Sequence, residues 1–219
     1  MKQPVRTVRA TRYVMPFRQG GSVPALVEAD DDGLYVVKLR GASQGEKALI
    51  AELVAGELGR ALGLAVPELV FVELDQAIAA AEPDPELCMP LSKSLGSNLG
   101  LDFLPASVTY DPLVGPHPDA EMAARIVLFD AFVSNVDRTV RNANLLTWHR
   151  STWLIDHGAS LYFHHGWRPE DPLESSADPF VEVRDHVLFA KLGSSSNLQR
   201  AAERMRTTLD DALIDRLVE

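Results

Sequence analysis

Hydrophobic and polar residues alternate along much of the first ninety residues, in the pattern of β-strands that bury one face. Residues 6–14 place β-branched side chains between polar ones, as a half-buried strand requires. Two apolar runs, at 24–28 and 34–39, flank Asp30-Asp-Asp-Gly33, a sequence typical of a hairpin loop. A further strand is predicted within 66–74. These segments predict a strand-rich N-terminal part.

One helical pattern interrupts these strands. Between about Glu46 and Leu62, apolar residues recur every three or four positions, and Gly63 supplies a stop signal. On a helical wheel, the predicted apolar stripe consists of Ile50, Leu53, Val54 and Leu58. Two further segments, 77–81 and 84–88, are interpreted as short helices or as part of a connection.

The second half of the chain is predicted to be mainly helical. A helix is expected over 119–132, where Asp119 can cap its first turn. Two more helices are expected over 180–192 and 198–217. The last of these patterns runs to the end of the sequence without a stop signal.

Between these parts lie short strands and long loops. Residues 145–148 and 152–155 are interpreted as two strands joined by a tight turn. Residues 92–100 are rich in Ser, Gly and Asn, and residues 105–118 contain four prolines, so both are predicted to be loops. Long loops in a compact domain are usually functional or mobile. We therefore expect a lobe boundary near residues 90–95.

Length, charge and composition argue against nucleic-acid binding, membrane insertion and secretion. The 219 residues suit one domain or one two-lobed unit, and the net charge of −10 disfavours binding to the phosphate backbone of a nucleic acid. No apolar stretch approaches the ~20 residues of a membrane-spanning helix, and no secretory signal is recognised. One cysteine, Cys88, cannot form an internal disulfide. We expect a cytoplasmic protein without a membrane anchor.

The densest group of polar residues lies between apolar segments of the second half. Asp137 and Asn142 are five residues apart in a predicted tight loop, and Asp156 follows an apolar strand and precedes His157-Gly158. Carboxylate and amide oxygens suit Mg²⁺, which takes few protein ligands and leaves other positions to water and phosphates. A carboxylate that is not a ligand can accept a hydroxyl proton. Local capping and turn formation is the alternative explanation for these residues.

Phosphoryl transfer needs this division of roles, together with a lysine that holds the phosphates. Lys38 ends the predicted strand 34–39, and Glu52 in the following helix is a candidate ion-pair partner, with Glu57 as its rival. Gly20, Gly21 and Ser22 lie between two predicted strands, where backbone N–H groups can contact phosphates. The predicted ligands are therefore Mg²⁺ and the phosphates of a nucleotide.

These residues together resemble the HipA-like kinases, a bacterial branch of the protein-kinase-like fold that is related to the phosphoinositide kinases. The segments that carry the resemblance are 37–41, 51–56, 61–67, 100–103, 129–132, 135–138, 142–144 and 154–158.

The resemblance implies an α+β, two-lobed fold that forms a single domain. The N-lobe, about 1–92, would hold a small antiparallel sheet and one helix, and the C-lobe, about 93–219, would be mainly helical. It implies transfer of the γ-phosphate of ATP, with Asp137 as base and with Asn142 and Asp156 on the metal. The acceptor it suggests is a protein Ser or Thr, and a small molecule or lipid head group is the alternative.

Three departures from the kinase pattern keep other functions open. Ser134-Asn-Val precedes Asp137 in place of His-Arg, Thr139 replaces a histidine, and His157 replaces the Phe of Asp-Phe-Gly. One alternative is a catalytically weak, pseudokinase-like module that binds nucleotide and regulates a partner. Another is a metal-dependent hydrolase that does not need Lys38. Arg138 and Arg141 are interpreted as solvated loop residues, with pairing to an acidic substrate or phosphate as the alternative.

Overall fold

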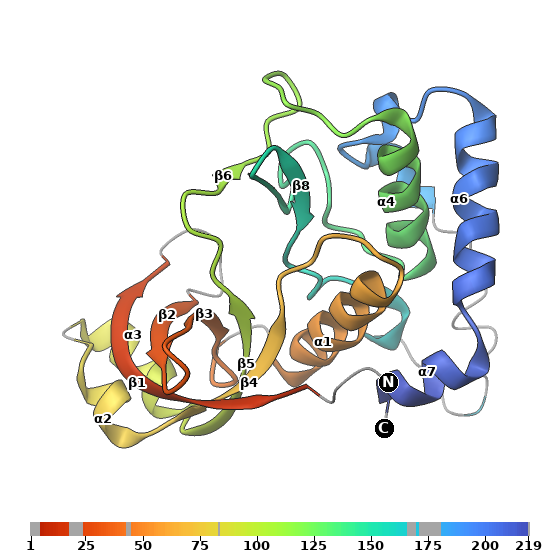
Figure 1. Ribbon diagram of the computed structural model, residues 1–219. Coiled ribbons are helices and arrows are strands. Elements are labelled where there is room, and N and C mark those ends of the chain that lie inside the picture. Colours follow the sequence, from red (N-terminus) through yellow and green to blue (C-terminus); the bar gives the residue numbers. More distant parts are fainter. Residues whose placement is uncertain are drawn as a thin grey trace. The chain divides into compact units, whose positions relative to one another are not determined.

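The computed structural model describes residues 5–17, 24–42, 45–82, 84–165, 170 and 181–218 (Figure 1). The contacts within the chain divide it into two compact units. The first unit contains Met1–Leu49 and Pro67–Pro105, and the second contains Ile50–Val66 and Ala106–Glu219. Among the described helices, none combines the length and the apolar character that crossing a membrane requires.

The first unit is built on a closed barrel of short strands. In spatial order, the strands are β1 (Thr7–Pro16), β2 (Ala25–Ala29), β3 (Leu34–Lys38), β5 (Gly96–Asp102) and β4 (Leu69–Leu74). The predicted hairpin of β2 and β3 is present. The prediction of a purely antiparallel sheet is wrong, because β1 pairs in parallel with β4 and so closes the barrel.

The length and the irregularity of β1 explain this closure. Its first residues, Thr7–Arg9, pair with β4, and the remainder pairs with β2. The register of the β1–β2 pair shifts twice, between Ala10 and Arg12 and between Tyr13 and Met15. Such irregularities bend a strand and increase its twist. One strand can therefore pair along both sides and leave the sheet with no open edge between β1 and β4.

Strand β5 lies where the sequence predicts a loop, and that prediction is wrong. Its glycine and asparagine fit the barrel for steric and hydrogen-bonding reasons. A Cβ atom on Gly100 would lie 2.5 Å from a methyl group of Val72, so only glycine allows β5 to approach β4. The side chain of Asn98 accepts a hydrogen bond from the Arg40 N–H at 3.0 Å and donates to the Ser94 carbonyl at 2.6 Å. Gly100 and Asn98 are therefore explained by contacts within the barrel and not by a loop conformation.

Two short helices cover the barrel, α2 (Gln76–Ala80) and α3 (Pro85–Ser92). Asp75 caps α2 by accepting hydrogen bonds from two backbone N–H groups, and Asp84 caps α3. Both helices contribute apolar side chains to the barrel core, where Ile78 and Leu91 are buried with the strand residues. The connection between β4 and β5 therefore supplies both helices that cover the barrel and part of its core.

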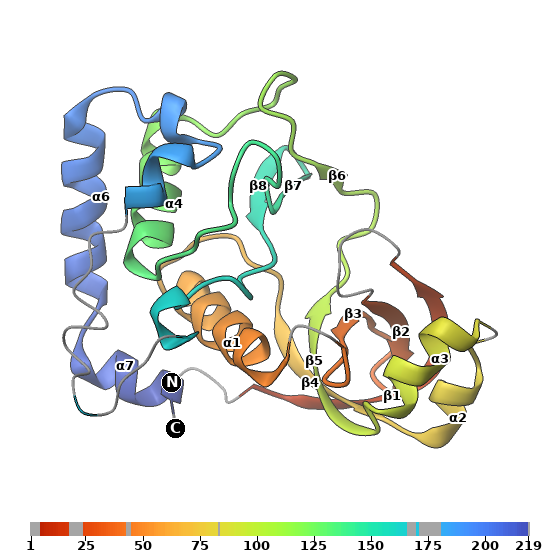
Figure 2. The ribbon, with the colours of Figure 1, turned by 180° about the vertical axis from the view of Figure 1, so that it is seen from behind.

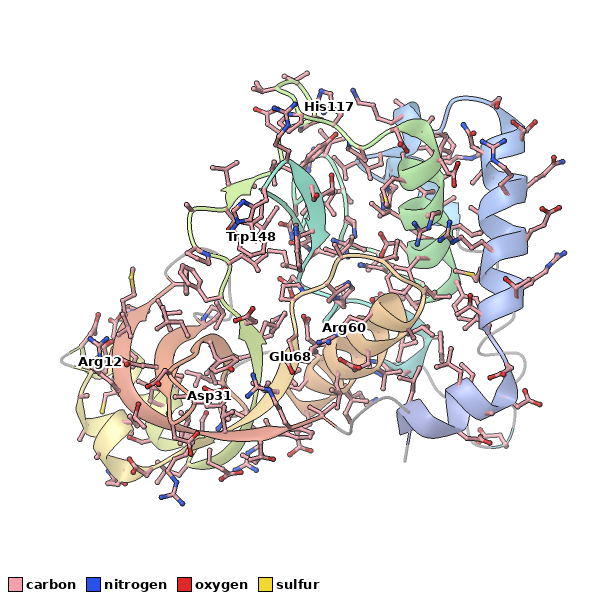
Figure 3. All side chains as sticks on the ribbon, in the orientation of Figure 1. Arg12, Asp31, Arg60, Glu68, His117 and Trp148 are labelled. Carbon is pink, nitrogen blue, oxygen red and sulfur yellow. The ribbon has the colours of Figure 1, made fainter. Side chains whose placement is uncertain are left out.

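A partly exposed ionic cluster lies at the loop of the β2–β3 hairpin. The Arg6 guanidinium donates to both oxygens of Glu68, at 2.9 and 3.1 Å, and also contacts Asp31. The Tyr35 hydroxyl donates to Asp31 at 2.8 Å. The side chains of Asp31 and Glu68 are labelled in Figure 3. The cluster joins the β2–β3 hairpin to Arg6, the residue before β1, and to Glu68, the residue before β4.

The helix α1 (Gly45–Ala61) turns an unexpected face inward. The apolar stripe predicted from the wheel is wrong in part, because Ile50 is 54% exposed while Leu58 is buried as predicted. The buried face instead consists of Ala51, Glu52, Ala55, Gly56, Leu58 and Gly59. A Cβ atom on Gly59 would lie 3.3 Å from the Phe129 ring, so small residues let α1 approach α4 (Ala120–Phe132) closely.

The second unit contains α4 and a small sheet. As predicted, Asp119 caps α4 by accepting a hydrogen bond from the Met122 N–H at 2.7 Å. The sheet has the order β6 (Val108–Thr109), β7 (Leu145–Trp148), β8 (Ser151–Leu154). His149 and Arg150 join β7 to β8 with φ of 47° and 65°, which is typical of a type I′ hairpin turn. The two predicted strands are thus confirmed.

The end of the chain differs from the predicted pair of long helices. Residues 181–192 form two 3₁₀ turns, Val181–Asp185 and Phe189–Lys191, because the chain between them forms an isolated β-bridge from His186 to Thr139. The predicted helix over 198–217 is two helices, α6 (Ser195–Thr208) and α7 (Asp211–Val218). The backbone is extended at Leu209, and the Asp210 carboxylate accepts from the Leu213 N–H. Helix α6 lies alongside α4 (Figures 1 and 2).

Candidate functional site

The loop that carries Asp137 begins where α4 ends. Ser134 adopts a left-handed conformation with φ of 51°, which turns the chain out of the helix. The Asn135 N–H then donates to the Asp130 carbonyl at 2.8 Å, and the Asn135 side chain donates to the Asp130 carboxylate at 3.1 Å. The Asn135 amide oxygen accepts from the Asp137 N–H at 3.1 Å. The start of the loop is therefore fastened to the last turn of α4.

Two amide side chains hold the carboxylate of Asp137. Its Oδ2 accepts from Asn142 Nδ2 at 2.7 Å and from Asn144 Nδ2 at 3.1 Å. Among the residues that the structure describes, no hydrogen-bond donor is found for Oδ1 of Asp137. The carboxylate is thus oriented through one oxygen, and the other remains available to a hydroxyl group. Asn144, which is buried, is a second partner that the sequence analysis did not assign.

Asp156 lies beside this loop through backbone contacts. The Ile155 N–H donates to the Asn144 carbonyl at 3.1 Å, immediately before Asp156. Asp156 has a left-handed backbone with φ of 54°, a conformation that is uncommon for residues other than glycine but better tolerated by Asp and Asn. The structure therefore brings Asp137 and Asn142 into direct contact and sets Asp156 next to a residue bonded to their loop.

The oxygen atoms in this region suit a hard divalent cation. Asn142 donates its amide nitrogen to Asp137, which leaves its amide oxygen as a ligand, and Asp156 offers a carboxylate. Within the described ranges, no three His, Cys, Asp or Glu residues gather in a way that would hold a metal ion by themselves. Mg²⁺ needs only one or two protein carboxylates when phosphates supply other ligands. Asn142 and Asp156 therefore fit Mg²⁺ bound together with a nucleotide.

Arg138 is buried, so its interpretation as a solvated residue is wrong. Its Nε donates to Asp130 at 2.7 Å, and both side chains are fully shielded from solvent. Its Nη1 donates to the Asn144 carbonyl and, at 3.2 Å, to the Ile155 carbonyl. One guanidinium thus joins the end of the Asp137 loop to the residue that precedes Asp156.

The charge of this arginine is balanced by a buried carboxylate. Burial alone would raise the pKa of Asp130, but the charge of Arg138 and the hydrogen bonds from His186 and Arg138 outweigh it and lower the pKa to about 2. The sequence signal was a single aspartate among the apolar residues of α4. A charged residue at a core position requires a partner, but the sequence does not say which residue supplies it.

Glu52 lies on the buried face of α1, where it approaches His157. The distance from Glu52 Oε1 to His157 Nδ1 is 3.7 Å, and both side chains are fully buried. The His157 ring also meets the Phe129 ring edge-on, with centroids 6.0 Å apart. The rival glutamate, Glu57, lies 3.5 Å from the Nε of Arg60 in the next turn. Glu52 rather than Glu57 is therefore the helix glutamate adjacent to the Asp156-His157 segment.

The remaining predicted residues belong to the first unit. Lys38 is the last residue of β3, pairs with Leu99 on the neighbouring strand β5, and is only 8% exposed. Burial is unusual for a lysine that has no specific role. Gly20, Gly21 and Ser22 lie outside the described residues. Asp137, Asn142, Asp156 and Glu52 all belong to the second unit.

Comparisons with known proteins give the family. A family model described as HipA-like kinase matches residues 11–177. No curated protein matches the sequence. Among solved structures, the Helicobacter pylori proinflammatory kinase CtkA aligns with a TM-score of 0.62 at 12% identity, over 98% of this chain and 86% of its own. The Golgi casein kinase with Mn/ADP bound gives a TM-score of 0.44 at 13% identity, over 99% and 70%.

At 12% identity, the likeness to CtkA concerns the fold, which is protein-kinase-like. The family match is independent of that likeness and extends from β1 past the Asp137 loop and Asp156, that is, over most of the chain. It confirms the resemblance that the sequence motifs indicated and identifies the activity class as phosphotransfer. The chain belongs to the HipA-like kinase family.

Proposed function

We propose that this protein is an ATP- and Mg²⁺-dependent kinase that transfers the γ-phosphate of ATP to a hydroxyl acceptor in the cytoplasm. The first candidate acceptor is a Ser or Thr of a protein, and the alternative is a small molecule or a lipid head group. The observation that supports the proposal most strongly is the way in which Asp137 is held. Asn142 and Asn144 fix Oδ2, and Oδ1 is left to receive a proton.

In this mechanism, Asp137 orients the acceptor hydroxyl and takes its proton on Oδ1 as the new O–P bond forms and the bond to ADP breaks. Asn142 and Asp156 hold the metal ion. When bound, Mg²⁺ neutralises charge on the transferring phosphates. Lys38 contacts the α- and β-phosphates, Glu52 keeps Lys38 oriented, and the backbone of Gly20, Gly21 and Ser22 contacts the phosphates.

The domain arrangement is part of the same proposal. The lobes expected from the sequence, about 1–92 and 93–219, would form a single kinase domain, with adenine bound near residues 88–104. The strand β5 runs through this last region, and its Asn98 side chain is fully used in hydrogen bonds to Arg40, Ser94 and Gly96.

The test is phosphate transfer by the wild-type protein and by Asp137→Ala, measured as autophosphorylation and as ADP release with ATP and Mg²⁺. Removal of a general base typically costs about 10²–10⁴-fold in rate. Because the base acts in the transition state, we expect the turnover to fall by that factor while ATP affinity stays near the wild-type value. Asp215→Ala, which removes an exposed carboxylate on α7, is the matched control.

Different results distinguish the alternatives. Wild-type activity in Asp137→Ala would disprove the assigned base. ATP binding by both proteins without transfer would indicate the pseudokinase alternative, and release of phosphate to water that survives Lys38→Met would indicate a hydrolase. In a kinase, Lys38→Met weakens the use of nucleotide, and Asp156→Asn abolishes metal-dependent nucleotide binding or turnover.

A further inference from the structure

His186 contacts the buried carboxylate beneath the Asp137 loop from a distant part of the sequence. It lies between the two 3₁₀ turns and beyond residues 11–177, which the family model matches. Its side chain is 5% exposed, and its Nε2 is 2.8 Å from Oδ2 of Asp130. The Leu188 N–H donates to its Nδ1 at 3.0 Å. The ring hydrogen therefore lies on Nε2 and points at Asp130.

The same segment also holds the backbone on the C-terminal side of Asp137. The Val187 N–H donates to the Arg138 carbonyl at 3.1 Å, and His186 forms a β-bridge with Thr139. Asp130 is thus bonded from three directions, by Asn135, by Arg138 and by His186. Two of these partners, Asn135 and Arg138, are themselves residues of the Asp137 loop.

The contacts of Asn135 and Arg138 then reach both parts of the candidate site, the Asp137 loop and the segment that carries Asp156. Asn135 receives the Asp137 N–H, and Arg138 binds the carbonyls of Asn144 and Ile155. Each contact on the way is a hydrogen bond between buried or partly buried groups. Hydrogen bonds in a buried network strengthen one another, and Nη2 of Arg138 is buried without a hydrogen-bond partner among the described residues, so its position depends on the bonds of Nε and Nη1. Without His186, Asp130 would lose one of its two Oδ2 donors, and the position of Arg138 would be less determined.

We propose that His186 is a positioning residue for phosphotransfer, which through Asp130 and Arg138 fixes the Asp137 loop relative to the residue that precedes Asp156. This inference rests on the proposed function of Asp137 and Asp156. It assigns a role to a part of the chain that the family match does not include. It also explains why residues 181–192 are not one helix, since His186 and Val187 must extend toward the loop.

The experiment compares His186→Leu, which removes the donor, with His186→Gln, whose amide nitrogen can reach Asp130 in place of Nε2. Arg184→Leu introduces the same leucine two positions earlier at an exposed site and is the control. A misplaced catalytic group can cost about 10²-fold. We expect His186→Leu to lower kcat by up to that factor with little change in the KM for ATP, and His186→Gln to recover most of the rate.

Amide hydrogen exchange provides a readout that does not depend on activity. We expect His186→Leu, but not Arg184→Leu, to speed exchange of the Asp137, Ile155 and Val187 amides, because each donates within the network. If the wild-type protein transfers no phosphate, the proposed function fails, and this exchange still decides whether His186 fixes the loop. If His186→Leu does not fold, His186→Asn, whose amide is too short to reach Asp130, takes its place.

Two outcomes would overturn the inference. One is wild-type kcat and wild-type exchange of the loop amides in His186→Leu. The other is an equal loss of activity and of thermal stability in His186→Leu and His186→Gln, which would indicate that His186 only stabilises the fold.

Discussion

Two ionic clusters of similar composition lie in very different surroundings. In the second unit, Asp130 and Arg138 are completely shielded from solvent. In the first unit, Arg6 contacts Asp31 and Glu68 while the three side chains are 40%, 31% and 41% exposed. Both clusters join segments that are distant in sequence. The buried cluster lies beneath a candidate active-site loop, and the partly exposed cluster lies at the β2–β3 hairpin of the barrel.

The energetic contribution of each cluster depends on its exposure to water. Burying two charges costs several kcal/mol per ion, so a buried pair often adds little net stability, whereas removing one partner is strongly destabilising. An exposed pair is screened by water and salt and is worth about 0–1 kcal/mol. The buried cluster is therefore best explained by the geometry that it imposes on the Asp137 loop. The exposed cluster is an ordinary surface feature.

The largest effect is expected from breaking the buried pair. Arg138→Leu leaves Asp130 ionised and without its main partner, and should lower the free energy of unfolding by about 3–5 kcal/mol. Urea unfolding followed by circular dichroism measures this loss. The double variant Asp130→Leu/Arg138→Leu removes both charges and should be more stable than Arg138→Leu alone. Equal stability of Arg138→Leu and the wild type would contradict the assigned pair.

A smaller effect is expected from acid. Asp130 has an ordinary pKa near 3.8 and a pKa of about 2 in the folded protein. A lowered folded pKa stabilises the protein above the unfolded pKa, and that stabilisation is lost as pH falls through the folded value. The shift corresponds to about 2 kcal/mol, lost between about pH 4 and pH 2. Unfolding curves across this range should show the loss, and the double variant should show less of it.

The smallest effect is expected at the exposed cluster. Arg6→Leu should lower the free energy of unfolding by no more than about 1 kcal/mol, and 1 M salt should remove much of the difference. The phenol of Tyr35 offers a separate check. Burial and the neighbouring Asp31 raise the pKa of Tyr35 to about 12, although Arg6 opposes the shift. Alkaline titration of the tyrosine absorbance should therefore detect one group that ionises late. A large loss of stability in Arg6→Leu would remove the contrast between the two clusters.

Local patterns predicted the fold well where local interactions determine it. The hairpin of β2 and β3, the capped helix α4 and the strands β7 and β8 follow from turn residues, a capping aspartate and alternation. Strand β5 was not predicted, because its Gly100 is explained only by the closeness of Val72 on the neighbouring strand β4. Barrel closure and the bridge at His186 also depend on distant segments.

The candidate site was predictable to a similar extent. The spacing of Asp137, Asn142 and Asp156 indicated the region, and the structure joins the first two through a hydrogen bond. Arg138 was misread, because a loop arginine in sequence does not show whether it faces solvent or a buried carboxylate. His186 carried no local signal at all. Its role depends on a contact with Asp130, 56 residues away in the chain.

The central claim is that Lys38 and the residues of the Asp137 loop serve one phosphoryl-transfer site. A crystal structure with a non-hydrolysable ATP analogue and Mg²⁺ tests it most directly. We predict that Asn142 and Asp156 bind the metal ion, that Lys38 contacts the α- and β-phosphates, and that Oδ1 of Asp137 faces the γ-phosphate. A triphosphate bound away from Lys38, or a metal ion that contacts neither Asn142 nor Asp156, would contradict the claim.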